Sequence, residues 1–390
     1  MNYNHPVKNN STVGIHLMCA IVFLTFSFVY LYFFQADVIA VVQHVLSYGV
    51  THYNRLVGAV LITLTLYLVQ LLIYVIVRLR KRSHALTYFP SMLALGIVSD
   101  VNYDVNQNFS LGAWWWLLPL LLVLWAGIAF LARALQEIEP DTETTGLFSR
   151  PMWINMLIMS FFIILVASFS NTNAVFHFRM RAESLMLEGK FDKALEVGSE
   201  SLESDADLQM IRMYALSRVG ELPERLFAYP IVAHSSAILP VEGQSQFLMY
   251  PVDSLYKFLG ARPGIPMSTS RYLQLMQMRS DSISDKRIAD YQLCGLLIDK
   301  RIDDFVIALR HLYAEGDSLD IDRLPLHYRE AMTLYTHLRS NPQIVYHHTV
   351  MDEDWDNMLE LEREYTNKTE RKIRVGKQYS NTYWFYYKYE

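Results

Sequence analysis

The sequence predicts an all-α protein in two parts: a bundle of four or five transmembrane helices, followed by a water-soluble helical domain. Two observations support this fold class. Long apolar runs occur only within residues 1–171, and helical periodicity with charged faces begins at about residue 173. The charges divide at the same place. Residues 1–171 contain 8 Lys+Arg and 7 Asp+Glu, and residues 172–390 contain the remaining 26 Lys+Arg and 32 Asp+Glu.

Four apolar runs have the length that a membrane-spanning helix needs, which is about 20 residues. They are Val13–Phe34, Leu56–Val77, Ala113–Ala132 and Met152–Phe169. The first run is too long for a cleaved signal peptide and has no small-residue cleavage site after it, so we expect it to remain as an anchor. Three consecutive tryptophans open the third run, and tryptophan favours the headgroup region of a bilayer.

The segment Ala85–Val98 is apolar but short for a span, and it leaves the number of spans open. As a re-entrant or interfacial helix it leaves four spans, with the soluble domain on the inner side. As a span it gives five, and the soluble domain then lies outside. With five spans, seven basic residues lie inside and only Arg55 outside; with four, Arg133 and Arg150 also move outside. The positive-inside rule therefore favours five.

The composition argues against several classes of function. There are only two cysteines, Cys19 and Cys294, so no disulfide framework and no cysteine-based zinc site can form. The soluble part carries a net charge of −6, whereas nucleic-acid binding requires a basic face. The common nucleotide-binding, hydrolase and metalloprotease motifs are missing. We expect no catalytic, cofactor-binding or metal-binding residues, and no nucleic-acid partner.

Polar residues flank the apolar runs and offer one alternative. Asp37 and Arg55 follow the first run, with Gln35, His44, His52 and Asn54 beside them, and Asp100, Asn102 and Asp104 follow the doubtful segment. An envelope enzyme acting on a lipid-linked or glycan substrate would use such outer carboxylates, with Asp37 and either Asp100 or Asp104 as its acids. Their irregular spacing is unlike a metal site, and we interpret them as solvated loop residues.

The soluble domain contains two similar stretches, Gly189–Leu195 and Gly220–Leu226, and the distance between them is close to the period of tetratricopeptide repeats. The first stretch resembles such a repeat, over Ala182–Asp207, although Gly198 and Pro223 depart from that pattern. Residues 227–270 are rich in Pro and Gly, which predicts an extended connection with short helical turns. The resemblance implies a degenerate repeat domain, an α-solenoid, over residues 172–351, and the concave face of such a domain is a binding surface.

The last residues, 352–390, have a composition of their own. They are acidic, then basic, then aromatic, with six aromatic residues between Tyr379 and Tyr387. Such a cluster is unstable in water. We expect a charged linker followed by an ordered aromatic segment that packs on the helical domain.

The whole chain is similar to a family of uncharacterised bacterial multi-span membrane proteins with a repeat-like C-terminal domain. The residues that carry this similarity are Phe34–Asp37, Leu324–Ala331 and Thr382–Tyr387. The resemblance implies a multi-pass protein of the bacterial inner membrane. We expect a membrane-anchored helical-repeat scaffold that recruits a protein partner at the cell envelope, with its soluble part in the periplasm.

Overall fold

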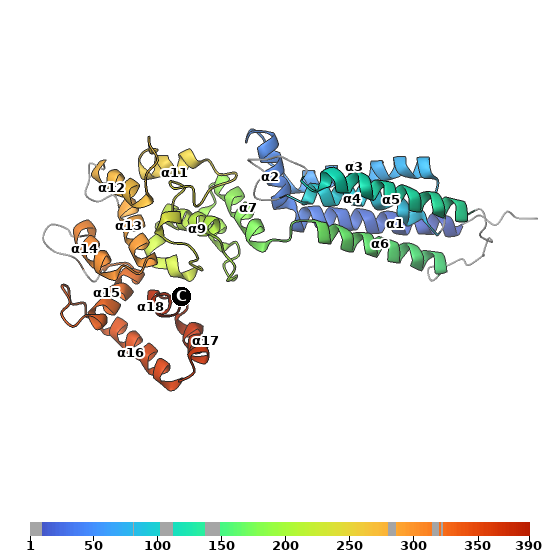
Figure 1. The fold of residues 1–390 in the computed structure, drawn as a ribbon. Coiled ribbons are helices and arrows are strands. Elements are labelled where there is room, and N and C mark those ends of the chain that lie inside the picture. Colours follow the sequence, from blue (N-terminus) through green and yellow to red (C-terminus); the bar gives the residue numbers. More distant parts are fainter. Residues whose placement is uncertain are drawn as a thin grey trace, which may run out of the picture. The chain divides into compact units, whose positions relative to one another are not determined.

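The computed structural model (Figure 1) describes residues 10–80, 82–101, 112–136, 149–279, 286–313, 320 and 323–390. Within these residues the regular secondary structure is entirely helical, which confirms the all-α prediction. The chain divides into two compact units, residues 1–173 and 174–390. Each unit has its own hydrophobic core.

The first unit contains four helices that are long and apolar enough to span a membrane. They are α1 (Asn10–Val29) with its π-helical continuation η1 (Tyr30–Phe34), α3 (Arg55–Val77), α5 (Trp114–Leu135) and α6 (Arg150–Phe169). Two shorter apolar segments accompany them, α2 (Ala36–Leu46) and the pair η2 (His84–Tyr88) and α4 (Phe89–Ser99). The doubtful segment of the sequence is therefore helical, but it is shorter than the four long helices.

Although η2 and α4 together are shorter than α6, they run beside it along most of its length. Near the start of α6, the side-chain oxygen of Asn155 accepts a hydrogen bond from the backbone N–H of Ala85, at 2.7 Å. Near its end, the backbone N–H of Asn171 donates to the carbonyl of Ser99 at 3.0 Å, and the Asn171 side chain donates to the carbonyl of Val101 at 2.6 Å. Two asparagines thus fix both ends of the short helix.

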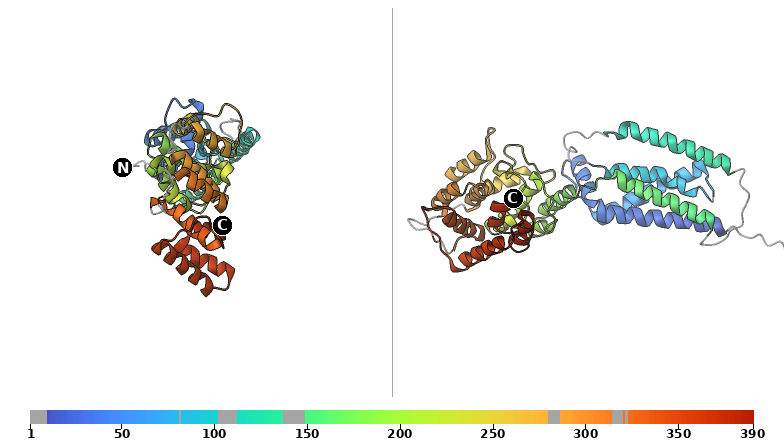
Figure 2. Two further views of the ribbon diagram at one scale, coloured as in Figure 1. Left: turned by 90° about the vertical axis from the view of Figure 1, so that its left-hand side faces the viewer. Right: turned by 60° about the horizontal axis from the view of Figure 1, so that its bottom comes forward.

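These contacts fix the direction of α4 relative to α6, and the hydrogen bonds of Gln70 with Thr87 and of Ser91 with the carbonyl of Leu66 show that α3 runs antiparallel to η2–α4. Since α4 runs parallel to α6, the chain returns along the bundle between α3 and α5. Helix α5 runs the opposite way: Trp114 at its start donates to Asp100 after α4, and Gln136 at its end donates to the carbonyl of Arg80 after α3. The chain therefore passes along the bundle five times, through α1, α3, η2–α4, α5 and α6. Helix α5 is the most exposed of the four long helices and lies at the edge (Figure 2).

The second unit contains both helical hairpins and irregular connections. Its helices are α7 (Ala174–Leu187), α8 (Phe191–Glu196), α9 (Ala206–Val219), α10 (Leu222–Arg225), η4 (Leu226–Ala228), η5 (Ser235–Ala237), α11 (Val252–Leu259), α12 (Thr269–Arg279), α13 (Lys286–Ile298), α14 (Ile302–Tyr313), α15 (Leu326–Leu338), α16 (Thr349–Glu364), α17 (Lys368–Tyr379) and α18 (Tyr383–Tyr389). Short helices separated by irregular segments occupy residues 227–270, as their proline and glycine content predicts.

The stretch that resembles a tetratricopeptide repeat has a short second helix. Gly189 and Gly220 follow α7 and α9 and adopt positive φ angles, as expected for residues that end helices. Helix α8, however, has only six residues. It is followed by Gly198 at φ +60°, where the ring of Phe178 occupies the space that a Cβ atom would need. An aromatic side chain is common at this position of the repeat, but it would not fit at residue 198, because the ring of Phe178 from α7 already fills the space.

A buried ionic network joins α7, α9 and the segment 246–250. Arg179 is fully buried and pairs with Glu183 and Asp207, and it donates to the carbonyl of Gln246 at 2.7 Å. Glu183 is also fully buried and accepts the backbone N–H groups of residues 248, 249 and 250. Burial raises the pKa of Glu183, and its contacts with Arg179 and the three N–H groups oppose that rise. The irregular segment is thereby held on the helices.

The aromatic C-terminal segment packs in the core of the second unit, as predicted. Tyr383 and Trp384 of α18 are buried, and Glu330 of α15 binds both. Its carboxylate accepts the backbone N–H of Tyr383 at 2.7 Å, and its carbonyl accepts the indole N–H of Trp384 at 2.6 Å. His327 completes the arrangement: it donates to the same carboxylate from Nδ1, because its Nε2 accepts the backbone N–H of Phe227.

The charged segment 352–378 is helical, where a linker was expected. It forms most of α16 and α17. Trp355 and Met358 of α16 and Val375 of α17 are buried in the same core as α18. The reason is that the spacing of residues 355 and 358 places two large apolar side chains on one face of an otherwise charged helix.

We expect Asn155→Leu to lower the stability of the membrane unit by about 1–3 kcal/mol, since it leaves the buried N–H of Ala85 without an acceptor. Equilibrium unfolding in mixed detergent checks this. Ser168→Ala on the same helix is the control, because the Ser168 hydroxyl is exposed and bonds only to its own helix. Equal stabilities of the two variants would contradict the role of Asn155.

We expect Trp384→Ala to destabilise the second unit by about 3–5 kcal/mol, the usual cost of emptying a buried aromatic site. The measurement is the urea midpoint of the full chain. The matched control is Ile373→Ala on α17, whose side chain is 57% exposed, and it should shift stability by no more than about 0.5 kcal/mol. Unchanged unfolding of the Trp384 variant would show that α18 is not part of the core.

Candidate functional site

The second unit contains a cavity of about 200 Å³ along helix α13. Helices α12 and α14 flank it, and η5 closes one side. Gly295 lies on its lining, and a Cβ atom there would touch Ser235 and Ile238 at 3.4–3.5 Å. The cavity is large enough for six or seven water molecules at about 30 Å³ each. It is therefore suited to one side chain or a small molecule, not to a nucleotide or a large cofactor.

The lining of this cavity, which we call the α13 groove, combines an apolar part with hydrogen-bonding groups. Leu273, Leu296 and Ile238 supply apolar surface. The polar members include two side-chain amides, one carboxylate, one guanidinium and the hydroxyl residues Ser235, Thr269, Ser270 and Tyr291; the first four are Gln274, Gln292, Asp299 and Arg301. Such a mixture binds an apolar group and fixes its orientation with a few polar contacts.

Two charged residues of the groove already have partners. Asp299 accepts the backbone N–H of Ser235 at 3.0 Å and also the hydroxyl of the same serine, which fastens η5 to the end of α13. Arg301 pairs with Asp304 at 2.7 Å on the exposed side of α14. The side-chain amides of Gln274 and Gln292 are the remaining large polar groups of the lining.

A second cluster joins α13, α14 and α15 through a carboxylate. Asp290 accepts hydrogen bonds from the hydroxyls of Tyr313 and Tyr328, the latter at 2.9 Å, and Cys294 lies 3.7 Å from the Tyr328 hydroxyl. Burial raises the pKa of Asp290 to about 6, and the two tyrosine hydroxyls offset part of this rise. The carboxyl of Asp290 therefore changes its charge at a higher pH than an ordinary aspartate.

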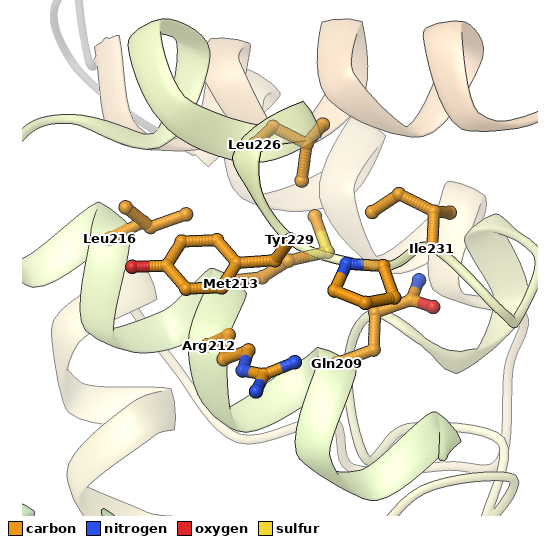
Figure 3. Close-up of a pocket in the computed structure, with 8 residues that line it drawn as sticks. Gln209, Arg212, Met213, Leu216, Leu226, Tyr229 and Ile231 are labelled. Atoms are coloured by element: carbon orange, nitrogen blue, oxygen red, sulfur yellow. The ribbon is translucent and has the colours of Figure 1, made fainter. Parts of the chain in front are cut away.

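A third feature is a narrow crevice beside α9 (Figure 3). Arg212 and Gln209 reach into it from α9, and Tyr229, Leu226 and Ile231 cover it. Arg212 is only 2% exposed, and its Nη2 donates to the carbonyl of Gly198 at 2.9 Å. Its Nε and Nη1 have no hydrogen-bond acceptor in the part of the chain that the structure describes.

The polar loop residues of the membrane unit have structural partners. Asp37 pairs with Arg55, and Asp100 accepts the indole N–H of Trp114 at 2.7 Å. Asn54 caps α3, and Gln35 bonds to Tyr30. Both carboxylates lie at the end of the bundle where α6 ends, but each has its own partner. His44 is half-buried and His52 exposed, while Asn102 and Asp104 lie outside the described residues.

The sequence analysis identified neither Arg212 nor the groove residues as functional candidates. The sequence does contain a signal for Arg212, because this charged residue lies four residues from both Leu208 and Leu216, on the buried face of α9. Gln274 and Gln292 carry no such signal, because their meeting depends on how α12 packs on α13. Among the described residues, no group of three His, Cys, Asp or Glu side chains is arranged to hold a metal ion.

The pKa of Asp290 predicts a pH dependence of stability. It is about 6 in the folded chain and about 4 when unfolded, so folding favours the neutral form. The resulting stabilisation is complete below pH 4 and is lost as the pH rises through 6. Asp290→Asn should therefore be as stable as wild type at pH 4 and more stable at pH 7.5, by up to about 3 kcal/mol.

Urea unfolding at four pH values between 4 and 7.5 measures this effect. Asp253→Asn, at an exposed site on α11, is the control and should leave the pH profile unchanged. A wild-type profile that stays flat between pH 4 and 7.5 would contradict the prediction.

The comparisons with known proteins concern only the last part of the chain. Residues 265–390, about a third of the sequence, match a family of unknown function (DUF6057). No curated protein and no solved structure gave a significant match. The matched residues extend from α12 to α18, so they include most of the α13 groove, Asp290 and the contacts of Glu330 with α18. This part of the chain is similar to that family of unknown function.

Proposed function

We propose that the protein is a membrane-anchored helical scaffold that binds an extended segment of a protein partner in the α13 groove. The observation that carries the proposal is the groove itself, a cavity of about 200 Å³ within a helical unit that directly follows a bundle of membrane-length helices. The tetratricopeptide resemblance of residues 182–207 agrees with it, since stacked helical hairpins form surfaces that bind peptides.

The size and chemistry of the groove favour a peptide segment. Its volume accommodates one apolar side chain, which would rest on Leu273 and Leu296 as an anchor. Gln274 and Gln292 each offer one acceptor and two donors, the groups that a peptide backbone needs beside such an anchor. A carboxylate and a guanidinium in the same lining balance each other, so the groove does not select a strongly charged ligand.

The membrane unit supports a location outside the cytoplasm. With five passes, α6 would end on the side opposite to the basic segment 78–82, and basic loops remain on the cytoplasmic side. In this arrangement the soluble unit lies at the outer face of the bacterial inner membrane, in the periplasm. The pass through η2 and α4 makes the number of passes five; without it there would be four, and the soluble unit would follow on the cytoplasmic side.

The proposal is tested with a photoreactive amino acid at Gln274, which lines the groove on α12. In native membranes we expect one cross-linked product of defined mass. Ala308→Trp should remove it, because Ala308 lines the groove on α14 and the indole would occupy much of the 200 Å³. Ile307→Trp is the matched control: Ile307 is the adjacent residue, is 57% exposed and does not line the groove.

The two tryptophan variants distinguish the possible outcomes. Loss of the product in the Ala308 variant and its retention in the Ile307 variant would support binding in the groove. A product that persists in both, or that consists of lipid, would contradict the proposal of a protein partner at this site. Circular dichroism of the purified variants verifies that both remain folded.

A further inference from the structure

The guanidinium of Arg212 is buried and forms no ion pair with any of the residues that the structure describes. Asp205 opposes the lowering of the Arg212 pKa by its charge, but its side chain caps α9 by accepting the N–H of Leu208 at 2.7 Å. Burial lowers the pKa of Arg212. Its remaining contacts are the carbonyl of Gly198 and the ring of Tyr229, whose centroid lies 5.1 Å from the guanidinium carbon.

The same unit shows how a buried arginine is compensated when its role is structural. Arg179 is as deeply buried as Arg212, yet it pairs with two carboxylates and one carbonyl. Removing charge from water is costly unless a partner offsets the loss of hydration. Arg212 has one carbonyl and one aromatic ring in place of those carboxylates, and two of its nitrogen groups lack any acceptor among the described residues.

The crevice beside Arg212 supplies apolar surroundings for a ligand. Leu226, Ile231 and Met213 line it, and Gln209 is fully engaged, since it bonds to the backbone of residues 232 and 233. The crevice is too narrow to hold a water molecule in this conformation. A ligand would enter by displacing Ile231, which is half-buried and lies in a segment without helix.

We propose that Arg212 and this crevice form a binding site for a carboxylate attached to an apolar group. The carboxylate would receive two N–H groups on one edge of the Arg212 guanidinium, namely the second N–H of Nη2 together with either Nε–H or Nη1–H. The apolar group would replace Ile231 against Leu226 and Met213. A planar guanidinium suits a carboxylate because two parallel hydrogen bonds can form. Phosphate fits the site less well, since its greater charge and hydration find no second cation in the crevice lining. The site is separate from the α13 groove.

Thermal unfolding of the full chain in detergent, at constant ionic strength, tests the site with three probes. They are 4-methylpentanoate, its neutral amide 4-methylpentanamide, and inorganic phosphate, each compared with chloride. A ligand that binds only the folded chain raises the midpoint. We expect 4-methylpentanoate to raise it by about 2 °C or more, and the amide and phosphate to leave it unchanged.

Three variants distinguish ligand binding by Arg212 from a structural role. Arg212→Met should unfold in chloride at or above the wild-type temperature, since it removes an uncompensated buried charge, and it should not respond to 4-methylpentanoate. Arg179→Met should unfold at a much lower temperature, because it leaves two carboxylates unpaired. Arg212→Lys keeps the charge but loses the fork of donors, and its response should be reduced.

Three results would contradict the proposed carboxylate site, and each would do so for a different reason. Equal shifts with the acid and the amide, or a shift that persists in Arg212→Met, would overturn the proposal. A shift with phosphate alone would overturn the carboxylate class. Failure of Arg212→Met to fold, together with a full response in Arg212→Lys, would show that Arg212 is structural.

Discussion

The arrangement of the membrane unit depends on the attachment of one short helix to α6. Backbone groups inside a bilayer must be satisfied within the protein, because lipid offers no hydrogen bonds. The N–H of Ala85 and the carbonyls of Ser99 and Val101 lie at the two ends of η2–α4, and Asn155 and Asn171 satisfy them. The chain thereby passes a fifth time along the bundle with a segment that is shorter than any of the four long helices.

The consequences extend to the soluble unit. If each pass along the bundle crosses the bilayer, an odd number of passes would put the end of α6 on the side opposite to the basic segment 78–82, so the proposed location of the α13 groove depends on how α4 packs. Burial explains how a helix of this length can be accommodated. Most of α4 is buried among its neighbours, and Trp125 of α5 donates to the carbonyl of Leu86 at 2.8 Å. A short helix exposed to lipid would instead leave the polar groups at its ends without partners in the hydrocarbon.

In the second unit, segments far apart in sequence are brought together by Glu330. It binds α18 through both its carboxylate and its carbonyl, and His327 connects it to η4. These contacts place α18 against α15, and the hydroxyl of Tyr386 reaches the carbonyl of Ile298 at the end of α13, at 2.6 Å. One end of the helix that carries the groove is therefore fixed by the C-terminal segment.

Much of the fold could be predicted from the sequence, because hydrophobic length and periodicity are local properties. The four long helices, the break over residues 227–270 and the packing of Tyr383 and Trp384 all follow from composition. The sequence favours a fifth span only through its count of basic residues, since residues 85–98 do not reveal that Asn155 and Asn171, far along the chain, form hydrogen bonds at the two ends of this segment. The helices α16 and α17 were not predicted, because the overall charge of this segment concealed Trp355 and Met358.

The candidate sites could not be predicted from local sequence patterns. Gln274, Gln292 and Asp299 meet only when α12, α13 and η5 pack together, so nothing in their neighbourhoods distinguishes them from surface residues. Arg212 differs, since a charge on the apolar face of α9 is visible in the sequence. What the sequence could not show is that Asp205, in the turn before α9, is used as a helix cap and forms no ion pair with Arg212.

The most direct test of the account is the side of the membrane on which each end of the bundle lies. Both native cysteines are buried, so single cysteines at Tyr48, Arg80 and Leu202, all exposed, can be labelled with an impermeant maleimide on intact bacterial spheroplasts. We predict labelling of the cysteines at positions 48 and 202 in intact spheroplasts, and of the cysteine at position 80 only after lysis. Labelling of positions 80 and 202 on the same side would contradict five passes, and with them the proposed site of partner binding outside the cytoplasm.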